Sequence, residues 1–109
     1  MAFATAREIF ETYLPSRFAS KADLVAKVNA AYKFVLEGPG GGTWVVDLTK
    51  PGGKVTAGDA PAGCTITMAT VDFLEMMNGK LNAQMAFLAG KLRVAGDMGL
   101  ALKLSGILT

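Results

Sequence analysis

The sequence contains no histidine and only one cysteine among its 109 residues. Histidine is the side chain most often used as a general base and as a metal ligand, so its absence removes the commonest catalytic chemistry. A single cysteine cannot form an internal disulfide, which agrees with a reducing compartment. The acidic residues are spread along the chain without a cluster suited to a metal or to paired catalytic carboxylates. We therefore expect no enzyme activity and no cofactor.

Long uncharged apolar runs are also missing, although 51% of the residues are hydrophobic and the mean hydropathy is +0.37. A membrane-spanning helix needs about 18 or more such residues in succession. The C-terminal region comes nearest, but it is interrupted by Lys80, Lys91, Arg93, Asp97 and Lys103. The N-terminus carries charges within its apolar stretch, so no secretory signal is predicted. We expect a single cytoplasmic domain over residues 1–109, with its apolar excess in a core, an interface or a pocket.

The chain has no strong excess of either charge, since 11 basic residues face 9 acidic ones. There is no basic stripe with interleaved aromatic residues, so nucleic acid is not an expected partner. Lysines such as Lys80, Lys91 and Lys103 are by default solvated surface residues. They leave room for transient contact with an anionic head group or a membrane surface.

Hydrophobic spacing predicts the elements of the first half. Residues 3–13 follow helical spacing, and Pro15 is expected to stop that helix. A second helix is expected from near Ser20. Strand alternation or β-branched composition then marks residues 32–37, 43–48, 64–68 and the short stretch 54–57, which we expect to form three or four antiparallel strands. The glycine-rich link at 38–42 lacks the Lys-Ser/Thr ending of a phosphate loop and is interpreted as a hairpin turn.

In the second half, polar residues stand where helices should begin. Thr70 is expected to cap one helix, Asn82 a short second helix and Asp97 a final one, with a strand over residues 91–95 between the last two. The sum is an α+β fold with helices covering one face of a sheet. Cys64 shares a strand face with Ile66 and Met68, so we interpret it as a buried structural thiol. Asp47 is expected at a solvent-facing strand position.

Methionine and other flexible apolar residues gather in the second half of the chain. From composition alone an ordinary core is the favoured interpretation, since most apolar stripes on helices are core. On the final helix, however, Leu102 lies about 200° around from Leu100, which makes that helix apolar on more than one side. A second apolar surface indicates a partner or a ligand.

From Tyr32 onward the sequence resembles the sterol carrier protein two family. The resemblance runs through residues 42–47, 64–68 and 72–74, and it is strongest in residues 79–84, 86–92 and 96–104. It implies a five-stranded, mostly antiparallel sheet covered by helices and enclosing a hydrophobic tunnel. It also implies binding, and transfer within the cell, of fatty acid, fatty acyl-CoA, sterol or phospholipid. The family often has proline where this chain has Ala83, and the last three residues are not a peroxisomal signal, which favours a cytosolic member.

The lipid-binding residues come from two sources. The resemblance implies that Gln84 makes a polar contact near the ligand and that Leu102 reaches it from the final helix. Periodicity and nearness to that motif add the apolar residues Phe73, Met77, Met85, Phe87 and Leu88. Alternatives remain open. One is a protein-interaction or substrate-presenting module of a lipid-metabolising enzyme, and another is a small acyl-thioester hydrolase, which the missing histidine disfavours.

Overall fold

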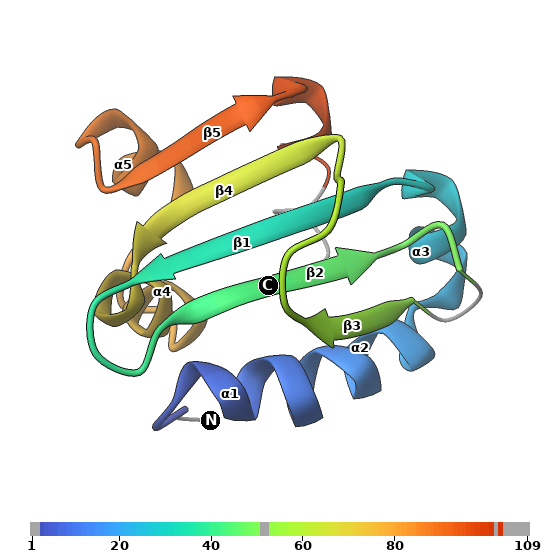
Figure 1. Ribbon diagram of the computed structural model, residues 1–109, viewed down its shortest axis with the longest axis horizontal. Helices are drawn as coiled ribbons and strands as arrows, with labels where there is room; N and C mark the ends of the chain where they lie inside the picture. Colours follow the sequence, from blue (N-terminus) through green and yellow to red (C-terminus); the bar gives the residue numbers. More distant parts are fainter. Residues whose placement is uncertain (1–2, 51–52, 102, 104–109) are drawn as a thin grey trace.

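The computed structural model describes residues 3–50, 53–101 and 103 of the chain (Figure 1). In chain order the elements are α1 (Ala6–Glu8), the π-helical segment η1 (Ile9–Tyr13), α2 (Leu14–Ser20), α3 (Ala22–Val28), β1 (Ala31–Glu37), β2 (Gly42–Asp47), β3 (Lys54–Ala57), β4 (Cys64–Ala69), α4 (Thr70–Met77), α5 (Ala83–Leu88) and β5 (Leu92–Gly96). Residues 98–101 are also helical. The predicted α+β class is confirmed.

The N-terminal helical run continues from residue 6 to residue 20, so the prediction that Pro15 stops the first helix is wrong. In η1 the N–H of Leu14 donates to the carbonyl of Ile9, five residues back. This change of register places Pro15 in the first turn of α2. Proline is tolerated there because its fixed φ suits the helix and its missing N–H costs little. The run ends at Lys21, and the predicted second helix follows as α3.

The five strands form one open, mixed sheet in the order β3-β2-β1-β4-β5. The pairs β1–β2, β2–β3 and β4–β5 are antiparallel, and β1–β4 is parallel. A mostly antiparallel five-stranded sheet is therefore confirmed, and β4 is the strand that runs parallel to its neighbour β1. The reason is the link at residues 58–63, which crosses the sheet in front of β2 and β1 in Figure 1. Parallel neighbours need such a crossover in place of a hairpin.

One face of the sheet forms the core, because strand side chains alternate between faces. Its buried side chains include Tyr32, Phe34, Leu36, Val46, Cys64, Ile66, Met68 and Leu92. The register sets Phe34 of β1 between Trp44 of β2 and Ile66 of β4. On the other face Lys33 pairs with Asp59 of the crossing link, with 3.0 Å between Nζ and Oδ1. The alternation predicted for β1 and β4 is confirmed.

Helix α4 follows β4 without a loop, and its first residue is Thr70. The prediction that Thr70 caps this helix is wrong, because Ala69 occupies the cap position with extended backbone. The Thr70 hydroxyl instead donates to the carbonyl of Glu37 at 2.9 Å, which ties the start of α4 to the end of β1. Asp72 lies in the first turn as predicted, where its charge suits the helix dipole.

The two other predicted caps are confirmed. The Asn82 side chain accepts hydrogen bonds from the backbone N–H groups of Gln84 and Met85, at 2.8 and 3.3 Å. The Asp97 carboxylate accepts from the backbone N–H of Gly99 at 2.8 Å. Both side chains satisfy donors that the first turn of a helix leaves unpaired.

Candidate functional site

The short helix α5 leaves its large apolar side chains in solvent. Met85, Phe87 and Leu88 are 62%, 41% and 73% exposed, whereas Ala86 is fully buried. The carbonyl of Ala86 also accepts a hydrogen bond from the backbone N–H of Lys91 at 2.9 Å, which holds α5 against the start of β5. Helix α5 therefore packs on the core through the small side chain of Ala86, while its larger neighbours face solvent. Half of the six large hydrophobic residues exposed in the described part of the chain lie on α5.

Gln84, on the same helix, is exposed as well. Its backbone N–H is engaged by the Asn82 cap. The four α5 residues predicted to bind lipid thus lie together on one six-residue helix at the surface. Leu102 lies outside the described residues.

Phe73 and Met77 of α4 lie in the hydrophobic core instead. Phe73 is completely buried and stacks on Phe10, with ring centroids 5.3 Å apart and an interplanar angle of 3°. Its ring also lies 5.9 Å from that of Phe34. Met77 is 9% exposed. Figure 1 shows α4 and α5 at the same end of the sheet, so the buried and exposed groups of predicted residues come from neighbouring helices.

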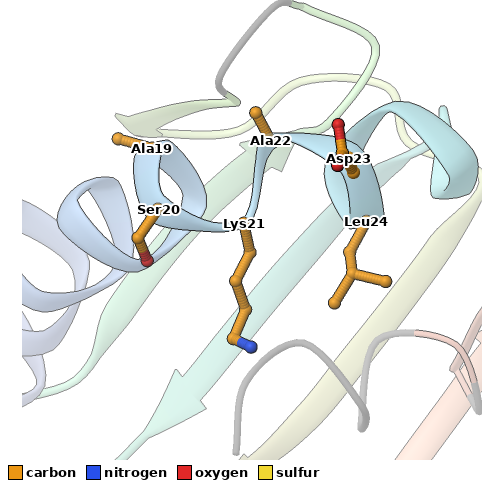
Figure 2. Close-up of a pocket in the computed structure, with 6 residues that line it drawn as sticks. All are labelled: Ala19, Ser20, Lys21, Ala22, Asp23 and Leu24. Carbon is orange, nitrogen blue, oxygen red and sulfur yellow. The ribbon is translucent and has the colours of Figure 1, made fainter.

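A surface hollow of about 320 Å³ lies at the junction of α2 and α3 (Figure 2). It is lined by six consecutive residues, Ala19, Ser20, Lys21, Ala22, Asp23 and Leu24. Figure 2 shows the side chains of Lys21 and Leu24 projecting to the same side of the ribbon. Sequence patterns gave no sign of this hollow, and none of the predicted lipid-binding residues line it. Because this hollow is lined by one continuous stretch of chain, it is not the predicted tunnel. The tunnel therefore stays a prediction.

The ionisable groups near the core are held in their neutral forms. Burial raises the pKa of the Cys64 thiol, and the nearby Asp97 charge adds to the effect. This agrees with the prediction of a buried structural thiol, because the nucleophilic form of cysteine is the thiolate. At the surface, hydrogen bonds from Thr49 lower the pKa of Asp47. Across the described ranges, no three His, Cys, Asp or Glu residues are grouped closely enough to hold a metal ion.

The hydrogen bond between Tyr32 and Leu100 could not be found from the sequence. Its side chain is completely buried, and its hydroxyl donates to the carbonyl of Leu100 at 2.7 Å. Burial raises the pKa of Tyr32 to about 12, with smaller contributions from Cys64 and Asp97. Strand alternation correctly indicates that Tyr32 faces the core. No local signal identifies a partner 68 residues away.

An open five-stranded sheet, helices on its apolar face and a short helix with an exposed apolar surface make up a small α+β domain. The chain belongs to the SCP-2 sterol transfer family, whose model matches residues 10–109. The resemblance found in the sequence is thereby confirmed. The description of this family names sterol transfer. Among the described residues, no helix is long and apolar enough to cross a membrane.

The chain also resembles part of several longer curated proteins. The chain is 41% identical over 101 residues to hydroxysteroid dehydrogenase-like protein 2 of Rattus norvegicus, covering 91% of this chain and 19% of the rat protein. It is 49% identical over 87 residues to sterol carrier protein 2 of Homo sapiens, covering 76% of this chain and 16% of the human protein. The chain therefore spans about a fifth or less of the length of these relatives.

Solved structures share the fold over nearly the whole chain. The sterol carrier protein domain 2 of Helicoverpa armigera matches with a TM-score of 0.73 at 32% identity, covering 99% of this chain and 92% of that one. Palmitated SCP2L2 from Aedes aegypti matches with a TM-score of 0.77 at 27% identity, covering 96% and 95%. Both agree with the five-stranded α+β architecture.

Proposed function

We propose that this chain binds lipids without catalysis and transfers them within the cell, holding fatty acid, fatty acyl-CoA, sterol or phospholipid in a hydrophobic tunnel. The observation that carries the proposal is the match of residues 10–109 to the SCP-2 sterol transfer family. The exposed apolar face of α5 supports it, because three large apolar side chains there are left without protein to cover them. The palmitated Aedes aegypti relative supports fatty acid as one ligand class.

The energy available from an acyl chain is sufficient. Each buried methylene contributes roughly 0.8 kcal/mol, so a dozen supply about 10 kcal/mol. Ordering the ligand and losing its translational freedom offset several kcal/mol of that gain. The remainder corresponds to micromolar binding or tighter, at about 8 kcal/mol for a micromolar Kd. Partition of an apolar chain out of water is therefore the proposed mechanism.

We assign the two groups of predicted residues different positions along the ligand. Phe73 and Met77 belong to the core and would form the inner wall, whereas Met85, Phe87 and Leu88 would cover the part of the ligand nearest the surface. Gln84, which is exposed at the first turn of α5, would meet a polar end group. Leu102 would contact the ligand from the final helix.

The same helix is the proposed place of transient membrane contact. Lys80 and Lys91 flank α5 in the sequence and are exposed, and no acidic residue occurs between residues 76 and 96. Positive charge beside exposed apolar side chains suits an anionic bilayer surface. Sedimentation with anionic and with zwitterionic vesicles separates this contact from ligand binding in solution.

Native mass spectrometry of the purified protein and displacement of a fluorescent fatty acid test the lipid proposal. Leu88→Glu should weaken fatty-acid binding about 10-fold or more, because it places a charge in an apolar contact worth roughly 1.5–3 kcal/mol. Val71→Glu is the matched control, since Val71 of α4 is 61% exposed and is not assigned to the site. The proposal fails if no lipid co-purifies and none displaces the probe. Equal weakening by both variants would remove Leu88 from the site.

A second candidate function is a protein-interaction or substrate-presenting module of a lipid-metabolising enzyme. The match to a hydroxysteroid dehydrogenase-like protein, of which this chain covers 19%, favours it. An interaction surface on α5 should cause association that added lipid does not relieve. Size measurement with and without fatty acid distinguishes this function from simple carriage, and absence of acyl-CoA hydrolysis would dismiss the thioesterase alternative.

A further inference from the structure

The link between α4 and α5 holds the N-terminal segment through one asparagine side chain. The amide oxygen of Asn78 accepts a hydrogen bond from the backbone N–H of Phe3 at 2.6 Å. The amide nitrogen of Asn78 donates to the carbonyl of Phe3 at 3.2 Å. Figure 1 shows α4 and the start of α1 at the same end of the sheet. We refer to this pair of hydrogen bonds as the Asn78 clasp.

The Phe3 ring keeps the Asn78 clasp closed. The ring belongs to the core, is 9% exposed and meets Tyr13 edge to face, with ring centroids 4.8 Å apart. Because both groups that Asn78 contacts are backbone groups of Phe3, the position of that residue decides whether they reach the amide. Loss of the ring contact would therefore open the clasp locally while the sheet stays folded.

Asn78 is also the asparagine of this chain that is best placed for deamidation. The chain has three asparagines, and only Asn78 is followed by glycine. Glycine has no Cβ to hinder approach to its backbone nitrogen, and asparagine is one of the thermolabile residues of proteins. Gly79 is exposed, and a Cβ added there would meet no atom within 4 Å. Water therefore reaches this peptide bond freely.

The reaction needs no reagent other than water. The backbone nitrogen of Gly79 attacks the side-chain Cγ of Asn78 and forms a C–N bond, which closes a cyclic succinimide. The bond between Cγ and the amide nitrogen breaks, and that nitrogen takes the proton of the Gly79 N–H and leaves as ammonia. Water then opens the ring at either carbonyl, which leaves aspartate or isoaspartate at position 78.

The folded geometry opposes the first step of this reaction. The attack requires the nitrogen and Cγ to be aligned at about 3–3.5 Å, so the Asn78 amide must leave Phe3 and turn toward the backbone. The N–H of Gly79 is also engaged, because it donates to the carbonyl of Met76 at 3.2 Å in the last turn of α4. Opening of the clasp must therefore precede the reaction.

We propose that Asn78 is a deamidation site guarded by the Asn78 clasp, and that its modification releases the N-terminal segment. A carboxylate at position 78 still accepts from the Phe3 N–H, but it has no donor for the Phe3 carbonyl. One hydrogen bond thus becomes a repulsive contact between two oxygens. Isoaspartate also lengthens the main chain by one carbon and displaces the side chain. This site is separate from the proposed lipid contacts on α5 and does not depend on them.

Peptide mapping by mass spectrometry during incubation at mildly alkaline pH measures the deamidation. Phe3→Ala keeps the Asn-Gly bond but removes the ring that closes the clasp, so deamidation at Asn78 should be about 10-fold faster than in the wild type. Phe3→Leu, which keeps more of the packing, should give a smaller increase. Val25→Ala is the matched control, since Val25 of α3 is 1% exposed and its truncation destabilises the fold without touching the clasp.

Local opening must be separated from global unfolding. Deamidation through the clasp should depend weakly on dilute urea, whereas deamidation through global unfolding depends on it steeply, because the slope follows the surface exposed. In concentrated urea, where no clasp exists, the wild type and Phe3→Ala should deamidate at one common rate. That rate should exceed the rate of the native wild type.

Asn78→Asp imitates one product of the reaction. Arg7 of α1 is exposed, so trypsin cleavage after Arg7 reports release of the N-terminal segment. We expect cleavage about 5-fold faster in Asn78→Asp than in the wild type, which corresponds to about 1 kcal/mol at 1.4 kcal/mol per factor of ten. Asn29→Asp is the matched control, because it adds the same charge at an exposed residue after α3 and should cleave at the wild-type rate.

Four results overturn the proposal. Absence of modification at Asn78 in Phe3→Ala would remove the deamidation site. Equal rates in native and urea-unfolded wild type would show that the clasp gives no protection. Equal acceleration by Phe3→Ala and Val25→Ala, with a steep urea dependence, would assign the reaction to global unfolding. Equal trypsin cleavage in the wild type, Asn78→Asp and Asn29→Asp would show that modification does not release the N-terminal segment.

Discussion

Replacing Phe10 with alanine should remove a large part of the stability of this domain. Phe10 is completely buried and contacts three other rings. It stacks on Trp44 at 4.9 Å and on Phe73 at 5.3 Å, and meets Phe34 edge to face at 5.4 Å. Truncating a buried phenylalanine to alanine costs about 3–5 kcal/mol, and each ring pair is worth about 0.5–1.5 kcal/mol beyond area burial. We expect a loss of about 4–6 kcal/mol.

That loss approaches the whole stability of a small domain, which is about 0.05–0.15 kcal/mol per residue. Phe10→Leu is therefore the more informative variant, because it keeps most of the volume and removes only the ring contacts, at a cost of about 1–3 kcal/mol. Phe87→Leu on α5 is the matched control. Phe87 is 41% exposed, so the same exchange should cost less than about 0.5 kcal/mol.

Urea unfolding followed by tryptophan fluorescence measures both variants, since Trp44 is the single tryptophan and lies in the cluster. The urea midpoint should fall for Phe10→Leu with an unchanged slope. If Phe10→Leu and Phe87→Leu had equal small effects, the ring stack would not be a stabilising part of the core. The reasoning from ring contacts would then be refuted.

Two further predictions follow from the backbone and from titration. Gly96→Ala should be strongly destabilising, by about 2 kcal/mol or more, because Gly96 has a φ of +101° and an added Cβ would collide with the Gly63 carbonyl. Gly90→Ala, at a φ of +78° in open space, should cost only about 1 kcal/mol in the same denaturation assay. In an alkaline titration followed by tyrosinate absorbance, Tyr32 should ionise near pH 12, and Tyr32→Phe should lack that step. Because the folded pKa is raised above the unfolded value, wild-type stability should fall relative to Tyr32→Phe as pH rises from about 10 to 12; a constant difference would contradict the assigned burial.

The strands and two of the caps could be predicted because their signals are local. Side chains in a strand alternate whatever the sheet contains, so the buried face of β1 and β4 follows from the pattern alone. Asn82 and Asp97 bond to backbone groups two or three residues away, which a sequence motif can encode. The order of the elements follows from the same local patterns, and the family resemblance added the count of five strands.

The failures involve distant partners, exposure and, for Pro15, a local change of helical register. Thr70 satisfies a carbonyl 33 residues away in preference to its own helix. Pro15 is accommodated because η1 shifts the helical register before the proline. The same segment buries the consecutive residues Ile9 and Phe10. Periodicity also groups side chains on a face without telling which face meets the core. On α5 the core receives Ala86, and the larger predicted residues are turned outward.

The filled part of the core limits where the proposed ligand can lie. On the β1–β2 side the interior is already occupied by the stacked rings around Phe10. Helix α5 leads into the start of β5, near Leu92. An acyl chain covered by α5, as proposed, would therefore run along β4 and β5, against Ile66 and its register partner Val94.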